Sequence, residues 1–231
     1  MKTLTKEQRI GDIVTQYPES ARIFNNLKID YCCHGDQYLE KVLKEKGINV
    51  FEFLENLNNK YKEFLNSKET YIDWKNENPL KLIDNIIKQH HHFTFKELDE
   101  IDQLLLKVFS VHYQHSSAEL KSVYKLFCNL KAELEGHLIK EEEELFPMIK
   151  EYLEEPSVYL RDEIMKMIGV IEYEHTVAGE ILQSLYRETN GYNIPNWGCT
   201  TYKLVYDKLD NLEKDLFIHI HKENSILFKL I

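Results

Sequence analysis

His137 and Glu141 lie four residues apart in the run GHLIKEEEELFPMIK. In an α-helix this spacing places both side chains on one face, one turn apart. The rest of that face is apolar when it is followed in steps of three and four residues, through Phe127, Leu130, Leu134, Leu145 and Met148. A carboxylate buried in such a stripe is strongly unfavourable unless it is paired or bound to a metal ion. The stretch therefore predicts half of a metal site.

Three other helical stripes repeat this arrangement. His219 and Glu223 have the same spacing, and His91 and His175 each interrupt an apolar stripe. The other members of these three stripes are Leu80, Ile83, Ile87, Thr94, Leu98, Ile101 and Leu105; Ile164, Ile168, Ile171, Ala178, Leu182 and Leu185; and Leu209, Leu212, Leu216, Ile226 and Leu230. One core histidine is usually held by ordinary hydrogen bonds, but four histidines with two carboxylates in phase favour a metal site. His221 falls off its stripe, and we expect it at the surface.

The six side chains suit two metal ions side by side. Two helices supply a histidine and a glutamate and two supply a histidine, so each ion could take two imidazoles while both carboxylates bridge. Positions then remain for an oxo or hydroxo bridge and an external ligand. Imidazole and carboxylate suit iron, manganese or zinc, so the spacing leaves the metal open. In four-helix bundles, carboxylate-bridged pairs are most often di-iron or di-manganese centres.

Composition and charge exclude several function classes. The chain has 231 residues and a formal net charge of −10, which argues against broad binding to nucleic acid or an anionic membrane. It has no apolar run near the roughly 20 residues of a membrane-spanning helix, and its N-terminus lacks the apolar core of a signal peptide. We therefore expect a cytoplasmic protein.

Few glycines and prolines and long segments rich in Leu, Ile, Lys and Glu predict an all-α protein. Residues 1–68 form a small helical N-terminal domain in this interpretation, and a polar linker follows at 69–78. Residues 79–231 then divide into four long amphipathic segments, at about 79–107, 115–152, 156–189 and 199–228, with Pro147 kinking or ending the second. Long helices joined by short loops predict an up-down four-helix bundle.

Other acidic residues lie near the predicted ligands. Glu133 comes one turn before His137, and Glu174 directly precedes His175. Either carboxylate could accept a hydrogen bond from a ligand ring, or it could simply be surface charge. In the tract from Glu141 to Glu144, only Glu141 is in phase with the apolar stripe, so we expect the others to be solvated.

Taken together, the motifs resemble a known family, the RIC (repair of iron centres) proteins, which combine a ScdA-type N-terminal domain with a hemerythrin-like domain. The resemblance covers nearly the whole chain and rests on DYCCHG near residue 30, the histidine triplet at His91, HLIKEEEELFP at 137–147, EHTVAGE at 174–180 and HIHKENSILF at 219–228. Two departures are His34 after the cysteine pair, where glycine is also familiar, and the absence of a proline after the final LF. Neither touches the predicted ligands.

The resemblance implies both a centre and a function. It implies two non-haem iron ions, oxo- and carboxylate-bridged, held by His91, His137, Glu141, His175, His219 and Glu223. It implies a cytoplasmic protein of the nitrosative and oxidative stress response that repairs damaged iron–sulfur clusters. The partners would be damaged or apo iron–sulfur proteins, with nitric oxide or O2 as a further ligand, and homodimers occur in the family.

The chain has four cysteines, of which Cys32 and Cys33 are adjacent. Adjacent cysteines form a strained, easily reduced disulfide, and His34 could lower the pKa of a neighbouring thiol. Alternatively, both cysteines are small core residues at a helix junction. The resemblance favours a functional thiol pair that holds iron, a cluster or sulfur during repair. We interpret Cys128 and Cys199 as structural.

Three functions compete on these observations. The first is iron–sulfur cluster repair by iron donation. The second is a hemerythrin-like carrier or sensor that binds O2 or nitric oxide without giving up metal. The third is a redox enzyme such as a nitric oxide reductase or peroxidase. The N-terminal cysteine domain favours repair, because a gas carrier does not need it.

Overall fold

The computed structural model describes residues 3–67 and 72–231, so the first three residues of the predicted linker, 69–71, lie outside it. Within those ranges the regular structure is helical, apart from one isolated antiparallel bridge between Arg9 and Tyr38. The fold is an all-α, hemerythrin-like up-down four-helix bundle preceded by a small helical domain, as predicted. No helix in the described part of the chain is long and apolar enough to cross a membrane.

Two compact units can be distinguished. One comprises Met1–Leu82 with Phe217–Ile231, and the other comprises Ile83–Leu216. The helices Pro79–Asn85 and Thr200–Ser225 each continue across a boundary between these units. The domain boundaries drawn from the sequence remain a prediction.

Four short helices begin the chain: α1 (Ile10–Gln16), α2 (Ser20–Asn26), α3 (Leu39–Glu45) and α4 (Val50–Asn66). Helix α3 ends before Gly47, whose φ of +68° is readily adopted by glycine. The side chain of Asn49 then caps α4 by accepting hydrogen bonds from the N–H groups of Phe51 and Glu52. Gly47 and Asn49 therefore explain why the boundary between these two helices could be predicted from the sequence.

The loop that carries Cys32 and Cys33 packs closely on α1. The N–H of Gly11 donates to the carbonyl of Gly35 at 2.9 Å. A Cβ atom added at Gly35 would lie 2.5 Å from the Tyr31 carbonyl, so only glycine fits there without rearrangement. This loop and α1 are therefore held in one arrangement.

The helices that follow are α5 (Pro79–Asn85), the π-helix η1 (Ile86–His91), α6 (His92–Lys140), the π-helix η2 (Glu141–Leu145), α7 (Phe146–Glu154), α8 (Val158–Glu188) and α9 (Thr200–Ser225). A 3₁₀ turn, η3 (Leu227–Leu230), follows α9. The second predicted segment does not end at Pro147, because α7 continues to Glu154 with the proline in its first turn, where its missing N–H is tolerated.

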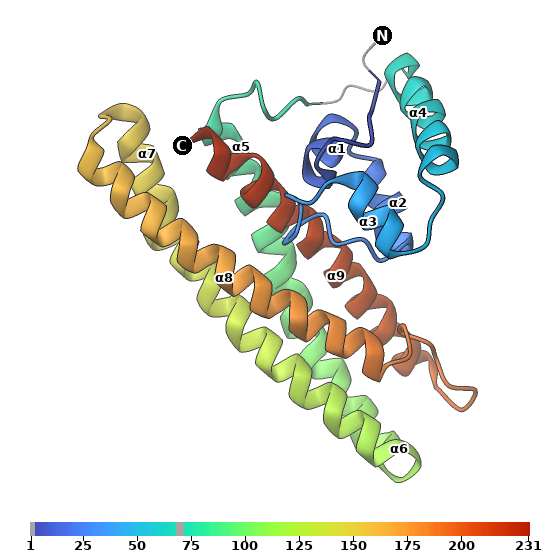
Figure 1. Cartoon of the computed structure of the whole chain (residues 1–231). Coiled ribbons are helices and arrows are strands. Elements are labelled where there is room, and N and C mark those ends of the chain that lie inside the picture. The colour runs from blue at the N-terminus through green and yellow to red at the C-terminus, as the bar shows by residue number, and fades with distance from the viewer. Residues whose placement is uncertain (1–2, 68–71) are drawn as a thin grey trace. The chain divides into compact units, whose positions relative to one another are not determined.

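Helix α6 folds back on itself. Asp99 and Lys131 are 32 residues apart, so a straight helix would separate them by about 48 Å at 1.5 Å per residue. Lys131 Nζ nevertheless lies 2.8 Å from Asp99 Oδ1, and the rings of Phe109 and Tyr124 are 6.1 Å apart. The reversal therefore lies between Phe109 and Tyr124, and Figure 1 shows it as a tight hairpin. The arms of α6 form parts of the first two predicted segments, which also include α5 and η1 before them and η2 and α7 after them. Helical hydrogen bonding continues through the reversal.

The π-helix η1 corrects the predicted register of the first stripe. Leu80 and Ile87 were expected in the core, but Leu82 and Ile86 are fully buried instead. A π-turn inserts one extra residue, so the core face advances five residues from Ile86 to His91. Positions on the N-terminal side of η1 are consequently shifted from the register that a regular α-helix predicts.

The π-helix η2 has the same effect on the second stripe. Met148 was expected in the core, but it is only half-buried, whereas Ile149 is fully buried. Leu145 and Phe146, four and five residues after Glu141, are both buried here. The stripe of α8 needs no correction, because all seven of its predicted members are buried.

Candidate metal centre

His91 is the last residue of η1, and its side chain has no exposed surface. Its Nε2 lies 3.3 Å from Glu141 Oε2, and its Nδ1 lies 2.7 Å from Glu142 Oε1. A carboxylate can only accept, so the short contact places the ring proton on Nδ1. The lone pair of the neutral imidazole is therefore on Nε2, on the side of Glu141.

His137 and His175 face each other from α6 and α8. Their Nε2 atoms are 3.1 Å apart, and Glu141 Oε1 lies 3.4 Å from His137 Nε2. His137 Nδ1 donates to Glu174 Oε2 at 2.9 Å, which again leaves the Nε2 lone pair pointing inward. Two nitrogens bound to one ion at about 2.0–2.1 Å lie roughly 3 Å apart, so this pair has the spacing of two ligands of one metal.

His219 and Glu223 lie on α9, one turn apart. Their side chains are 1% and 0% exposed, and His219 Nε2 lies 3.0 Å from Glu223 Oε1. The H-x-x-x-E spacing thus brings both side chains to one buried face, as the sequence predicts.

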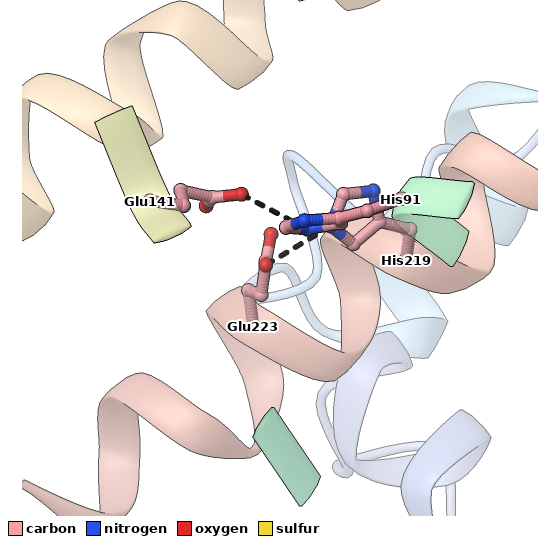
Figure 2. Close-up of side chains that lie close together, drawn as sticks. All are labelled: His91, Glu141, His219 and Glu223. Carbon is pink, nitrogen blue, oxygen red and sulfur yellow. Dashed lines mark hydrogen bonds and ion pairs between the residues drawn. The ribbon is translucent and has the colours of Figure 1, made fainter. Parts of the chain in front are cut away.

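Two groups of four buried side chains could each hold a metal ion. One is His91, Glu141, His219 and Glu223, which Figure 2 draws, and the other is His137, Glu141, His175 and Glu223. In each group the candidate ligand atoms lie within 4.8 Å of one another. Both groups contain the same two glutamates, so the residues brought together are the six predicted from the sequence.

The donor set fits a cation. Glu141 and Glu223 have no exposed side-chain surface, and imidazole nitrogens of His91, His137 and His219 lie 3.0–3.4 Å from their carboxylates. The hydrogen bonds at Nδ1 direct the Nε2 atoms of His91 and His137 toward these carboxylates. Two buried carboxylates are strongly destabilising without compensating positive charge, which divalent or trivalent metal ions supply.

Two outer carboxylates orient the imidazoles. The hydrogen bond from His137 is the main cause that lowers the pKa of Glu174 to about 2. Lys140 lowers this pKa further, whereas partial burial raises it. Glu174 is therefore fully ionised at neutral pH and holds the ring of His137 in one tautomer. Glu142 does the same for His91.

The sequence predicted only one of the two outer carboxylates that contact the candidate ligands. Glu174 does reach a ligand ring, and it reaches His137 rather than the adjacent histidine. Glu133 is exposed. Glu142 was expected to be solvated, and this was wrong, because its carboxylate contacts His91. Its position directly after an in-phase glutamate was the only available signal.

The prediction for His221 was also wrong. It is 4% exposed, and its Nε2 lies 3.3 Å from the hydroxyl of Thr15 in the same compact unit. Its ring is 5.7 Å from that of Tyr31, and burial lowers its pKa to about 3. Thr15 of α1 and Tyr31 of the following loop thus lie against a face of α9 that we expected to be exposed to solvent.

The cysteine loop forms a separate acidic thiol cluster. Ligand atoms of Asp30, Cys32 and Cys33 lie within 4.8 Å of one another, and the two sulfurs are 3.7 Å apart, so the cysteines are free. Burial raises the pKa of Cys32. His34 Nδ1 donates to Asp30 Oδ2 at 2.7 Å, so this ring nitrogen contacts a carboxylate.

Comparisons with known proteins agree with this architecture. Residues 6–61 match ScdA_N, a domain of unknown function (DUF542), and residues 82–231 match the hemerythrin HHE cation binding domain. The chain is 33% identical over 225 residues to the iron-sulfur cluster repair protein YtfE of Escherichia coli O8 (strain IAI1), with 96% of each chain covered. The same values hold for the iron-sulfur cluster repair protein YtfE of Shigella boydii serotype 4 (strain Sb227).

Proposed function

Because this chain belongs to the family of iron-sulfur cluster repair proteins, with a ScdA-type domain followed by a hemerythrin-like domain, we propose that it repairs iron–sulfur clusters. The damage would come from nitrosative or oxidative stress, and the partners would be damaged or apo iron–sulfur proteins. Repair would proceed by iron donation from a di-iron centre.

The observation that carries this proposal is that two groups of four ligands share two glutamates. One iron would be held by each group, with Glu141 and Glu223 contributing to both. His91 and His219 would hold one iron, and His137 and His175 would hold the other. The pair would supply redox chemistry and bind small ligands such as nitric oxide or O2.

The chain's own residues determine how firmly iron is held. Glu142 and Glu174 keep two of the imidazoles oriented with their Nε2 lone pairs inward. Glu141 can offer an oxygen to each group, because its Oε2 lies near His91 and its Oε1 near His137. Glu141 and Glu223 would hold both irons, so we propose these two carboxylates as the residues that control donation.

The thiol cluster supports repair over a carrier or a redox enzyme. Asp30, Cys32 and Cys33 provide a second group of metal-binding atoms in the N-terminal unit. Sulfur and carboxylate ligands could receive iron or contact a cluster, a task that neither gas binding nor turnover of nitric oxide or peroxide requires.

Iron transfer is the experiment that tests this function. Metal content and Mössbauer spectra are measured on the anaerobically purified protein before and after it is mixed with an apo-ferredoxin. We expect about two irons per chain, with a bridged ferric signal that moves into the acceptor. Two irons that stay in place while nitric oxide or O2 still binds would instead indicate a carrier or an enzyme.

Replacing both Cys32 and Cys33 by alanine is expected to abolish repair of an acceptor cluster while the iron content of the bundle stays unchanged. The reason is that the thiol cluster has its own metal-binding atoms, separate from the six ligands. Cluster absorbance of the repaired acceptor and iron per chain are the two readouts. Cys128→Ala is the control, because Cys128 is exposed. Full repair by the double variant would contradict the role given to these thiols.

A further inference from the structure

Cys199 lies at the beginning of a long helix. It directly precedes α9, and its carbonyl accepts a hydrogen bond from the N–H of Lys203 at 3.0 Å. Its sulfur accepts from the backbone N–H groups of Tyr202 and Thr201, as the side chain of a helix-capping residue does. The positive end of the helix dipole and two N–H donors all favour a negative charge on this sulfur. The residue is exposed, so reagents can reach it.

A histidine from a distant part of the chain contacts the same sulfur. His112 Nε2 lies 3.2 Å from Cys199 Sγ, although the two residues are 87 positions apart. The His112 ring is 5.5 Å from the ring of Trp197 and meets the ring of Tyr202 edge-on at 5.8 Å. His112 is 8% exposed, so the imidazole is held in place by aromatic packing while the thiol faces solvent.

We propose that Cys199 and His112 form a nucleophilic thiol site that reacts with disulfides of small thiols. The proton of the Cys199 thiol passes to His112 Nε2. The thiolate then bonds to one sulfur of the disulfide, the S–S bond breaks, and the second sulfur leaves as a thiolate that takes up a proton. The small disulfide is the oxidant and is reduced to one free thiol, while Cys199 ends as a mixed disulfide.

The pKa of Cys199 is shifted in the opposite direction from that of Cys32 in the cysteine pair. The hydrogen bond to His112 and the backbone N–H groups lower the pKa of Cys199 to about 7. About half of its molecules are then thiolate at pH 7, compared with a few per cent for a thiol of ordinary pKa. Burial raises the pKa of Cys32, the opposite direction. The interpretation of Cys199 as structural is not supported by its position, because an exposed sulfur contributes little to packing.

The test is the pH dependence of modification of the full chain by 2-hydroxyethyl disulfide, with each cysteine followed by mass spectrometry of its peptide. We expect Cys199 to react severalfold faster than Cys128 at pH 7, with a rate that rises through an inflection near pH 7. Cys128 is the internal reference, because it is exposed as well. Equal rates at the two residues, or an inflection for Cys199 above about pH 8, would overturn the proposal.

A variant tests the role of the imidazole. In His112→Asn the inflection should move toward about 8.5, which reduces the thiolate at pH 7 about fifteenfold. The higher intrinsic nucleophilicity of the less acidic thiol offsets part of this, so the rate at pH 7 should fall about three- to fourfold. Gln114→Asn, an exposed position on the same helix, is the control and should leave the profile unchanged. An unchanged profile in a folded His112→Asn would contradict the pairing. If that variant does not fold, the wild-type profile still decides.

Discussion

Replacing Glu141 by glutamine is expected to remove at least one of the two proposed irons and to lower the Tm of the iron-loaded protein by about 5–10 °C. Glu141 contributes to both groups of ligands, so its loss weakens both positions at once. Metal binding that occurs only in the folded state adds directly to stability, by about 2.7 kcal/mol when the free metal is at 100 times its Kd. Iron per chain and the Tm with and without a chelator are the measurements.

Without metal, the melting temperatures of the variant and the wild type should no longer follow this order. The amide of Glu141→Gln is uncharged and nearly the same size as the carboxylate, which has no exposed surface in the native chain. Without iron, the variant should therefore melt at or above the temperature of the wild type. Glu143→Gln is the matched control in the same run of glutamates, because Glu143 is exposed, and it should change neither value. An equal loss of stability with and without iron would show that Glu141 only fills space.

Replacing Glu142 by glutamine should weaken iron binding by about 10- to 100-fold without removing a ligand. The carboxylate accepts a hydrogen bond from His91 Nδ1 at 2.7 Å, so it fixes the tautomer and raises the basicity of the nitrogen that faces the metal. A glutamine amide can accept the same bond, but it lacks the charge and can rotate to present its NH₂ group. Competition with a chelator of known affinity measures the change.

The matched control for this substitution is Glu144→Gln, two residues further along the same run, since Glu144 is exposed. The metal-free Tm of Glu142→Gln should stay close to that of the wild type, because the side chain is about one-third exposed. A wild-type iron affinity in Glu142→Gln would mean that the bond to His91 does not tune the centre.

Helical periodicity predicted the fold and gathered the six candidate ligands because each ligand lies on a face that is buried along most of its length. The stripe through His175 shows this most clearly, since every predicted member is buried. Periodicity identifies the residues along the centre of a buried helix face, but it does not identify residues at the edges of that face. Glu142 lies about 100° around the helix from Glu141 and reaches His91 from that edge, so a search for in-phase residues passes over it.

The predictions for His221 and Glu142 were wrong because of contacts between residues distant in sequence. His221 was assigned to solvent on the assumption that α9 has one buried face, whereas Thr15 and Tyr31 cover another. The pairing of His112 with Cys199 joins residues 87 positions apart, and no local sequence pattern predicts it. Such contacts depend on how elements pack, which composition and spacing do not specify.

The metal centre depends on the exact number of residues in the two π-helices, whereas the formation of the helices does not. Each of η1 and η2 contains one candidate ligand, His91 or Glu141, and one residue more than a regular turn would hold. Deleting a single residue from η2 would restore ordinary α-helical hydrogen bonds and leave a sound helix. The flanking segments would keep the faces they present to the core, because the π-turn absorbs the extra residue, but the side chains inside the turn, which include Glu141, would change direction. A one-codon deletion could therefore separate the capacity to fold from the capacity to bind metal, which no conservative substitution in the core would do as cleanly.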